Sequence, residues 1–292
     1  MSKSSIFKLL VSFSLLYYLI SIFDFELLST ISIDIIPLFL FGVLFLAIAL
    51  LMMSIRWRIL SAYNDISNNI NLIEYYKLYF IGSFFNIFFP GGIGGDLVRI
   101  KYFTNLKNIK IKESTAIVIK ERVFGIVALF LLLLVGTVYS INEIVKSDLN
   151  IISLKMALPT GLLLILGYFF YLRRSSNIMI GDFILLVTLS GIGQFADILI
   201  VYMFIFYFDI SIEFINLLFI MPLIYFVTVL PISLGGIGVR EGAFVFLMTI
   251  FGVDSSVAIL ISFLLYFVKV LIGLIGMFVY LRYKVKFNDK EG

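Results

Sequence analysis

Long apolar runs separated by short charged segments dominate this chain. A helix that crosses the hydrocarbon core of a bilayer needs about 20 predominantly apolar residues. Runs that reach or approach this length are 6–23, 35–55, 123–142, 155–172, 182–208 and 255–281. Two further apolar stretches, 78–95 and 214–252, are each interrupted by a glycine-rich segment. We predict spanning helices for the uninterrupted runs and a different structure for the interrupted stretches.

Composition places the chain in a bilayer. Its residues are 62% hydrophobic and only 14% charged, whereas roughly a quarter of the residues of a soluble domain are charged. We expect one integral membrane domain over residues 1–292, because no hydrophilic stretch is long enough for a further domain. Cysteine and histidine are absent from the sequence, which excludes disulfides, thiol catalysis and the usual zinc or haem ligands. We expect no metal and no cofactor.

The first apolar run has the basic start of a signal peptide, with Lys3 and Lys8. A signal peptide ends at a cleavage site made of small residues. The run is instead followed by Phe23-Asp24-Phe25-Glu26. We therefore interpret it as a retained helix.

The basic residues predict the orientation of the chain, because Lys and Arg collect in short cytoplasmic loops. They cluster at the N-terminus, at 56–58, at 99–122, at 173–174 and in the tail from 282. The segments 24–34 and 209–213 carry acids and no base, which suits the outside. This pattern predicts a multi-pass protein of the cell membrane with cytoplasmic N- and C-termini.

The same pattern implies that each interrupted stretch begins and ends on one side of the membrane. Stretch 78–95 lies between inside segments, and stretch 214–252 lies between outside segments. We predict an all-α polytopic fold of about six full transmembrane helices plus two re-entrant hairpins in an inverted-repeat arrangement. The alternative is eight transmembrane helices. The arm 242–252 is short for a crossing, which favours the re-entrant hairpins.

Both breaks have residues that stop a helix and turn the chain. Proline ends a helix and glycine permits sharp turns. The residues concerned are Pro90, Gly91, Gly92, Gly94 and Gly95 in the first break, and Pro231, Gly235, Gly236 and Gly238 in the second. The returning helices should begin near Asp96 and near Val239. The unpaired N–H groups and the dipole at a helix start favour anions.

Charged residues follow each break within a turn. Arg99 and Arg240 add positive charge, while Asp96 and Glu241 are placed to cap the same helices. One interpretation is a cationic groove near the midplane that accepts an anionic headgroup. The other is a pair of internal ion pairs that only satisfy two buried turns. Asn86, one turn before the first break, either bonds a freed carbonyl or lines the groove.

Further charges lie within or beside predicted helices, where charge is costly and indicates function. Asp197 and Lys269 sit near the centres of two spanning runs and are candidates for pairing. Glu121 and Arg122 open the run 123–142, either as an interfacial cap or as part of the site. The stretch 104–121 alternates lysines with isoleucines. It is either a helix on the cytoplasmic surface that attracts anionic lipids or an ordinary charged loop.

These motifs together resemble the lysylphosphatidylglycerol synthase transmembrane region. This flippase-like family includes the membrane half of the multiple peptide resistance factor. The resemblance rests on Asn86, the run 90–99, Glu121-Arg122, and the second break with Glu241. It implies a domain that moves or binds a lipid between leaflets. It also implies lipid-site roles for Asp96, Arg99, Arg122, Arg240 and Glu241. Larger members carry a soluble lysyl-transferring domain; this chain ends at Gly292, so we expect no such activity.

Three functions are consistent with the sequence. The first is a lipid-binding protein or translocase whose partners are membrane lipids, anionic ones foremost, and not nucleic acid. The glycine run lacks the Gly-Lys-Ser/Thr of a nucleotide-binding loop. The second is a glycosyltransferase that uses a polyprenyl-phosphate donor, with Asp24 and Glu26 as catalytic acids. The third is a non-transporting scaffold for envelope assembly.

Overall fold

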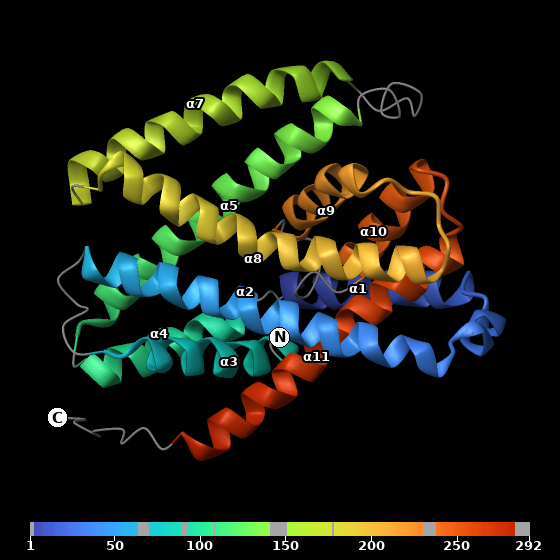
Figure 1. Ribbon diagram of the computed structural model, residues 1–292, viewed down its shortest axis with the longest axis horizontal. Helices are drawn as coiled ribbons and strands as arrows, with labels where there is room; N and C mark the ends of the chain where they lie inside the picture. The colour runs from blue at the N-terminus through green and yellow to red at the C-terminus, as the bar shows by residue number, and fades with distance from the viewer. Residues whose placement is uncertain are drawn as a thin grey trace. The chain divides into compact units, whose positions relative to one another are not determined.

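Helices make up all the regular structure in the described part of the chain. A computed structural model describes residues 3–63, 70–88, 93–107, 109–140, 151–176, 178–229 and 238–283 (Figure 1). The elements are α1 (Lys3–Ser21), the 3-10 helices η1 (Phe25–Thr30) and η2 (Ile33–Ile35), α2 (Ile36–Ala62), α3 (Leu72–Phe88), α4 (Ile93–Lys107), α5 (Ile111–Tyr139), α7 (Ile151–Ser176), α8 (Ile180–Tyr207), α9 (Phe214–Val229), α10 (Val239–Ile250) and α11 (Ser255–Arg282).

Several of these helices are long enough to cross a membrane. In the part of the chain that is described, four are both long and apolar enough: Ile33–Ala62, Ile111–Tyr139, Ile180–Tyr207 and Ser255–Arg282. The other two predicted spans form α1, with 19 residues, and α7, with 26. The predicted class of helical membrane protein is thus confirmed.

Two helices extend well beyond their predicted ends. Helix α2 continues to Ala62, so Arg56 lies within it and not after it. Helix α5 begins at Ile111 instead of near residue 123. Its first turns bury Ser114, Ile117, Val118 and Glu121, and this spacing places one helical face in the core. The prediction of a surface helix or loop over 104–121 is therefore wrong for residues 111–121.

The order and lengths of the helices repeat along the chain. The first repeat, residues 36–139, consists of α2 to α5, with lengths of 27, 17, 15 and 29 residues. The second repeat, residues 180–282, consists of α8 to α11, with lengths of 28, 16, 12 and 28 residues. Each repeat thus has two long helices around two short ones, and the glycine-rich break falls between the short pair.

The chain forms two compact units. Unit 1 contains Met1–Phe45, Leu129–Leu164 and Phe195–Val268, and unit 2 contains Leu46–Ala128, Ile165–Gln194 and Lys269–Gly292. The short helices α3 and α4 belong entirely to unit 2, and α9 and α10 belong entirely to unit 1. Each of the long helices α2, α5, α8 and α11 contributes one part to each unit.

The two repeats pass through these units in opposite order. Helix α2 begins in unit 1 and ends in unit 2, whereas its counterpart α8 begins in unit 2 and ends in unit 1. Helix α5 runs from unit 2 to unit 1, and its counterpart α11 runs from unit 1 to unit 2. Each long helix of the first repeat therefore runs between the units in the direction opposite to that of its counterpart in the second repeat.

Glycines let each short hairpin pack closely against the other repeat. In unit 2, a Cβ atom at Gly276 of α11 would lie 2.0 Å from the carbonyl oxygen of Phe80 in α3. In unit 1, a Cβ atom at Gly136 of α5 would lie 2.3 Å from the backbone nitrogen of Phe219 in α9. Only a residue without Cβ allows such backbone approach, as in close helix crossings within membranes.

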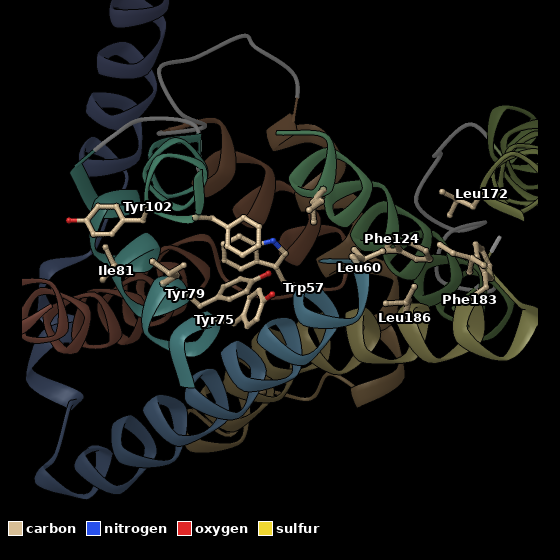
Figure 2. Close-up of a cluster of buried hydrophobic side chains, with 14 of the residues drawn as sticks. Trp57, Leu60, Tyr75, Tyr79, Ile81, Tyr102, Phe124, Leu172, Phe183 and Leu186 are labelled. Carbon is tan, nitrogen blue, oxygen red and sulfur yellow. The ribbon is translucent and has the colours of Figure 1, made fainter. Parts of the chain in front are cut away.

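Aromatic side chains build the core of unit 2. Trp57 of α2 lies beside Tyr75 and Tyr79 of α3 (Figure 2), with ring centroids 5.3 and 5.7 Å away. Phe103 of α4 approaches the same indole at 4.9 Å. Trp57, Tyr75 and Phe103 are fully buried. This cluster joins α2 to the α3–α4 hairpin.

Candidate functional site

The hairpin of α3 and α4 is closed at its break by one side chain and one glycine. Asn86 of α3 accepts a hydrogen bond from the backbone N–H of Gly95 at 2.7 Å. This bond satisfies one of the N–H groups that a helix start leaves unpaired. A Cβ atom at Gly95 would lie 2.4 Å from the carbonyl oxygen of Gly82. The side-chain oxygen of Asn86 is thus an acceptor, and a bond from its amide nitrogen to a freed carbonyl stays a prediction.

Helix α4 begins earlier than predicted. Its first residue is Ile93, so Gly94 and Gly95 lie in its first turn and not in the connecting turn. A glycine is needed there because the two helices of the hairpin nearly touch. Of the predicted break residues, Pro90, Gly91 and Gly92 lie outside the described residues.

A network of buried charges connects this hairpin to α2 and α5. Glu121 of α5 accepts hydrogen bonds from Arg56 of α2, at 2.6 Å, and from Arg99 of α4, at 3.3 Å. Asp96 of α4 pairs with Arg99 and, at 2.5 Å, with Arg122 of α5. Five charged side chains from three helices thus form one chain of ion pairs, in the order Arg56, Glu121, Arg99, Asp96, Arg122.

Most of this network is shielded from solvent. The side chains of Arg56, Arg99 and Glu121 are 6%, 8% and 3% exposed, whereas that of Arg122 is 49% exposed. Taking charges out of water is costly unless they are paired and hydrogen-bonded. Arg122 is therefore the end of the network that an external group reaches most easily.

Aromatic rings cover the central guanidinium group. The Arg99 guanidinium lies 4.2 Å from the centroid of the Tyr79 ring and 5.0 Å from that of Trp57. A cation over the face of an aromatic ring is attracted by the ring's quadrupole. This arrangement holds Arg99 in place between Asp96 and Glu121.

Three buried groups beside the network lack a hydrogen-bond partner among the described residues. They are the Nε of Arg56, the indole nitrogen of Trp57 and the hydroxyl of Tyr79. The first two can only donate a hydrogen bond, and the third can donate one. The interior around Arg99 therefore holds more donors than acceptors.

The second break has its own charged pair in unit 1. Gly238 precedes α10 with φ of 80°, a conformation that favours glycine. The Glu241 side chain accepts a hydrogen bond from the Gly238 N–H at 2.8 Å and pairs with Arg240, which lies over the Tyr266 ring at 5.2 Å. The predicted cap by Glu241 is confirmed. Pro231, Gly235 and Gly236 lie outside the described residues.

The remaining predicted charges are placed separately. Asp197 of α8 accepts a hydrogen bond from the Tyr225 hydroxyl of α9, within unit 1. Lys269 of α11 opens the segment that belongs to unit 2. Pairing between Asp197 and Lys269 stays a prediction. The joint lining of one groove by both breaks also stays a prediction.

Sequence reasoning missed two members of the site. Arg56 is expected to follow the run 35–55, although Trp57, Ile59 and Leu60 continue the apolar pattern beyond it, and a charge inside such a pattern indicates a buried partner. Ser190 of α8 accepts a hydrogen bond from Arg56 at 2.6 Å, and a serine in an apolar helix gives no comparable signal. Glu121 and Arg122 lie about three turns inside α5, so the interpretation as an interfacial cap at the helix start is wrong.

Asp24, one of the acids predicted to lie outside, caps a short helix. Asp24 is the N-cap of η1 and accepts a hydrogen bond from the Glu26 N–H at 2.9 Å. Side-chain capping of this kind stabilises a helix start. A catalytic role of Asp24 and Glu26 stays a prediction.

The fold and the buried charges define a multi-pass helical membrane protein with a charged site buried between helices. Residues 5–276 match the family described as Lysylphosphatidylglycerol synthase TM region, and the chain belongs to this family. The resemblance drawn from the sequence is thereby confirmed. No curated protein and no solved structure matches the chain.

Proposed function

We propose that this protein binds the anionic headgroup of a membrane lipid at the charge network of unit 2 and moves the lipid between leaflets. The observation that carries the proposal is the half-exposed Arg122 at the end of an otherwise buried network. Charged residues within a membrane are costly, and their retention indicates a functional site. Membership of the family supports a lipid as the ligand.

Re-entrant hairpins are part of this proposal. Helix α3 has 17 residues and α10 has 12, which correspond to lengths of about 25 and 18 Å. The hydrocarbon core is about 30 Å thick. Each hairpin also belongs entirely to one unit, whereas the long helices contribute to both. These observations favour hairpins that enter and return over eight full crossings.

Inverted repeats support movement of the lipid and not only its binding. The two repeats pass through the units in opposite order, as expected when they have opposite orientations in the membrane. Transporters built from inverted repeats expose a central site to each side in turn by moving one part against the other. We infer that the two hairpins serve opposite leaflets.

The test is lipid translocation in proteoliposomes that contain the purified protein and tail-labelled phosphatidylglycerol. The wild type should accelerate the exchange of the labelled lipid between leaflets. Arg122→Gln should slow this exchange by about tenfold or more, because hydrogen bonds to a charged group contribute about 1.5–3 kcal/mol.

Lys112→Gln is the matched control. Lys112 is exposed on the same helix, and its replacement removes the same charge away from the network. This variant should move lipid as fast as the wild type. If the wild type neither moves phosphatidylglycerol nor carries a bound anionic lipid through purification, the proposed function is wrong.

A further inference from the structure

The two repeats follow one register along the chain. Helices α2 and α8 begin 144 residues apart, at Ile36 and Ile180, and α5 and α11 also begin 144 residues apart, at Ile111 and Ser255. The sequence Gly-Gly-Ile-Gly that starts at Gly91 recurs 144 residues later. A residue of the first repeat therefore has a counterpart 144 positions further on, and the contacts of the two repeats can be compared position by position.

In unit 2, two tyrosines at helix ends join one repeat to the other. Tyr63, directly after α2, donates a hydrogen bond to Asp182 in the first turn of α8. Tyr283, directly after α11, donates one to Glu74 in the first turn of α3, and Lys77 pairs with the same carboxylate at 3.0 Å. Both acceptors are carboxylates, so both bonds are charge-assisted. We call these two bonds the carboxylate clasp.

In unit 1, the corresponding helix ends also join the repeats, but through neutral groups. Tyr207 ends α8 and is the counterpart of Tyr63. Its hydroxyl accepts a hydrogen bond from the Ser32 N–H at 2.9 Å and lies 3.0 Å from the Ser32 Oγ, just before α2. Ser140, directly after α5, donates a hydrogen bond to the Asn216 side chain in the first turn of α9 at 2.7 Å. Neither contact has a charged donor or acceptor, and we call the two the neutral clasp.

We propose that the two clasps open in turn as the repeats rock against each other, and that the neutral clasp opens more readily. Rocking of one inverted repeat against the other separates the contacts at one end and keeps those at the other. Hydrogen bonds to a charged group are roughly twice as strong as those between neutral groups. Asp34 bonds to Ser32 of its own segment, so its charge does not directly join the repeats.

The unequal clasps give the protein a preferred direction of opening. The basic residues predict that the helix ends in unit 2 face the cytoplasm, because the clusters at 56–58, 99–122 and 173–174 all belong to that unit. The protein without substrate therefore opens mainly to the outside. This inference goes beyond the proposed function, since it concerns which end opens and is measured without any movement of lipid.

Distances across each end measure the opening. Spin labels on introduced cysteines span the unit 2 end in the pair Asn71→Cys and Ile180→Cys, and the unit 1 end in the pair Glu213→Cys and Ile36→Cys; all four positions are exposed. Pulsed electron paramagnetic resonance in lipid nanodiscs gives the distribution of distances for each pair. In the wild type, a second, longer distance should be about tenfold more populated at the unit 1 pair than at the unit 2 pair.

Removing the hydroxyl donors should shift these populations. Tyr63→Phe combined with Tyr283→Phe should raise the ratio of longer to shorter distance at the unit 2 pair by about tenfold or more. The matched change in the neutral clasp, Tyr207→Phe with Ser140→Ala, should act at the unit 1 pair by a smaller factor. Tyr17→Phe, which removes an exposed hydroxyl from α1, should change neither pair. Tyr63→Phe alone tests the same direction if the double variant does not fold.

The outcomes separate this inference from the proposed function. Equal populations of the longer distance at both ends of the wild type would contradict the unequal clasps. A single distance at both pairs that neither double variant changes would show that the clasps do not control opening. Both results leave lipid exchange in proteoliposomes to be judged by itself. Distances that respond as expected in a protein that moves no phosphatidylglycerol would support the clasps and contradict the proposed function.

Discussion

At the scale of single residues, the site combines charged side chains that are buried with one, that of Arg122, that is about half exposed. Glu121 is the carboxylate on which the buried part of the network depends, because it joins Arg56 and Arg99, both of them buried. Removing one partner of a buried pair leaves the other charge uncompensated, at a cost of about 3–5 kcal/mol. Replacing an exposed charge changes stability by about 0.5 kcal/mol or less.

Glu121→Gln should therefore lower the free energy of unfolding in detergent by about 3 kcal/mol or more. The matched change Glu113→Gln, on the same helix but exposed, should lower it by less than about 0.5 kcal/mol. Denaturant titrations followed by the fluorescence of Trp57 measure both values. Equal stability of the two variants would show that Glu121 does not hold the network together.

Residue chemistry was only partly predictable from the sequence. The motif around the first break identified Asp96 and Arg99, and the start of the run 123–142 identified Glu121 and Arg122, because charge in an apolar context stands out. The sequence did not reveal that Arg99 is covered by Trp57 and Tyr79. That contact depends on how α2, α3 and α4 pack, which the residues next to Trp57 in the sequence do not reveal.

At the scale of elements, glycines control how closely the short helices pack. The existence of the long helices followed from the apolar runs, but the starts of α4 and α5 did not. Gly94 and Gly95 would weaken an isolated helix, so they were predicted to lie in the turn. Close packing against Gly82 and the hydrogen bond that the Gly95 N–H donates to Asn86 outweigh that cost. The start of α5 was predicted too late, because the lysines on its exposed face suggested a charged surface segment. Its other face is buried.

Gly95→Ala should open the α3–α4 hairpin. The added methyl group would lie 2.4 Å from the carbonyl oxygen of Gly82, and backbone must move to accept it. Overpacking of this kind costs about 1–3 kcal/mol. Gly167→Ala is the matched control, because no atom lies within 4 Å of its new Cβ.

Thermal unfolding in detergent should show a clear loss of stability for Gly95→Ala. For Gly167→Ala it should show no loss, or a gain of up to about 1 kcal/mol from helix propensity. The exchange of labelled lipid in proteoliposomes should also slow in Gly95→Ala, since Asp96 and Arg99 follow on the same helix. A Gly95→Ala protein as stable as the wild type would mean that the close approach at Gly82 is not needed.

At the scale of the whole molecule, the two repeats and the two units together define the architecture. The sequence predicted an inverted repeat, because the basic segments place both ends of the first interrupted stretch inside and both ends of the second outside. The two repeats pass through the two units in opposite order, which fits this prediction without relying on charge. The opposite orientation of the repeats in the membrane stays a prediction. The sequence could not show that the end of α5 packs against α9 and that the end of α11 packs against α3. Gly136 and Gly276 make those contacts and resemble any other glycine in an apolar run.

Cysteine labelling tests this architecture directly, since the natural chain has no cysteine. Single substitutions Asn71→Cys and Lys110→Cys flank the first hairpin, and Glu213→Cys and Asp254→Cys flank the second; all four positions are exposed. With a membrane-impermeant maleimide, the first two should react only from the cytoplasmic side and the last two only from the outside. Labelling of both pairs from one side would contradict the inverted orientation.

The depth of the first hairpin separates re-entrant helices from full crossings. Asn86 lies near the end of α3 and is exposed. A full crossing would bring it to the outer surface, whereas a re-entrant helix leaves it about half-way through the bilayer, out of reach of a bulky outer reagent. Asn86→Cys should therefore resist outer labelling under conditions that label Glu213→Cys completely. Rapid outer labelling at Asn86 would establish eight crossings. The charge network that follows it would then lie near the outer headgroups, where charged side chains reach water and need no transport function.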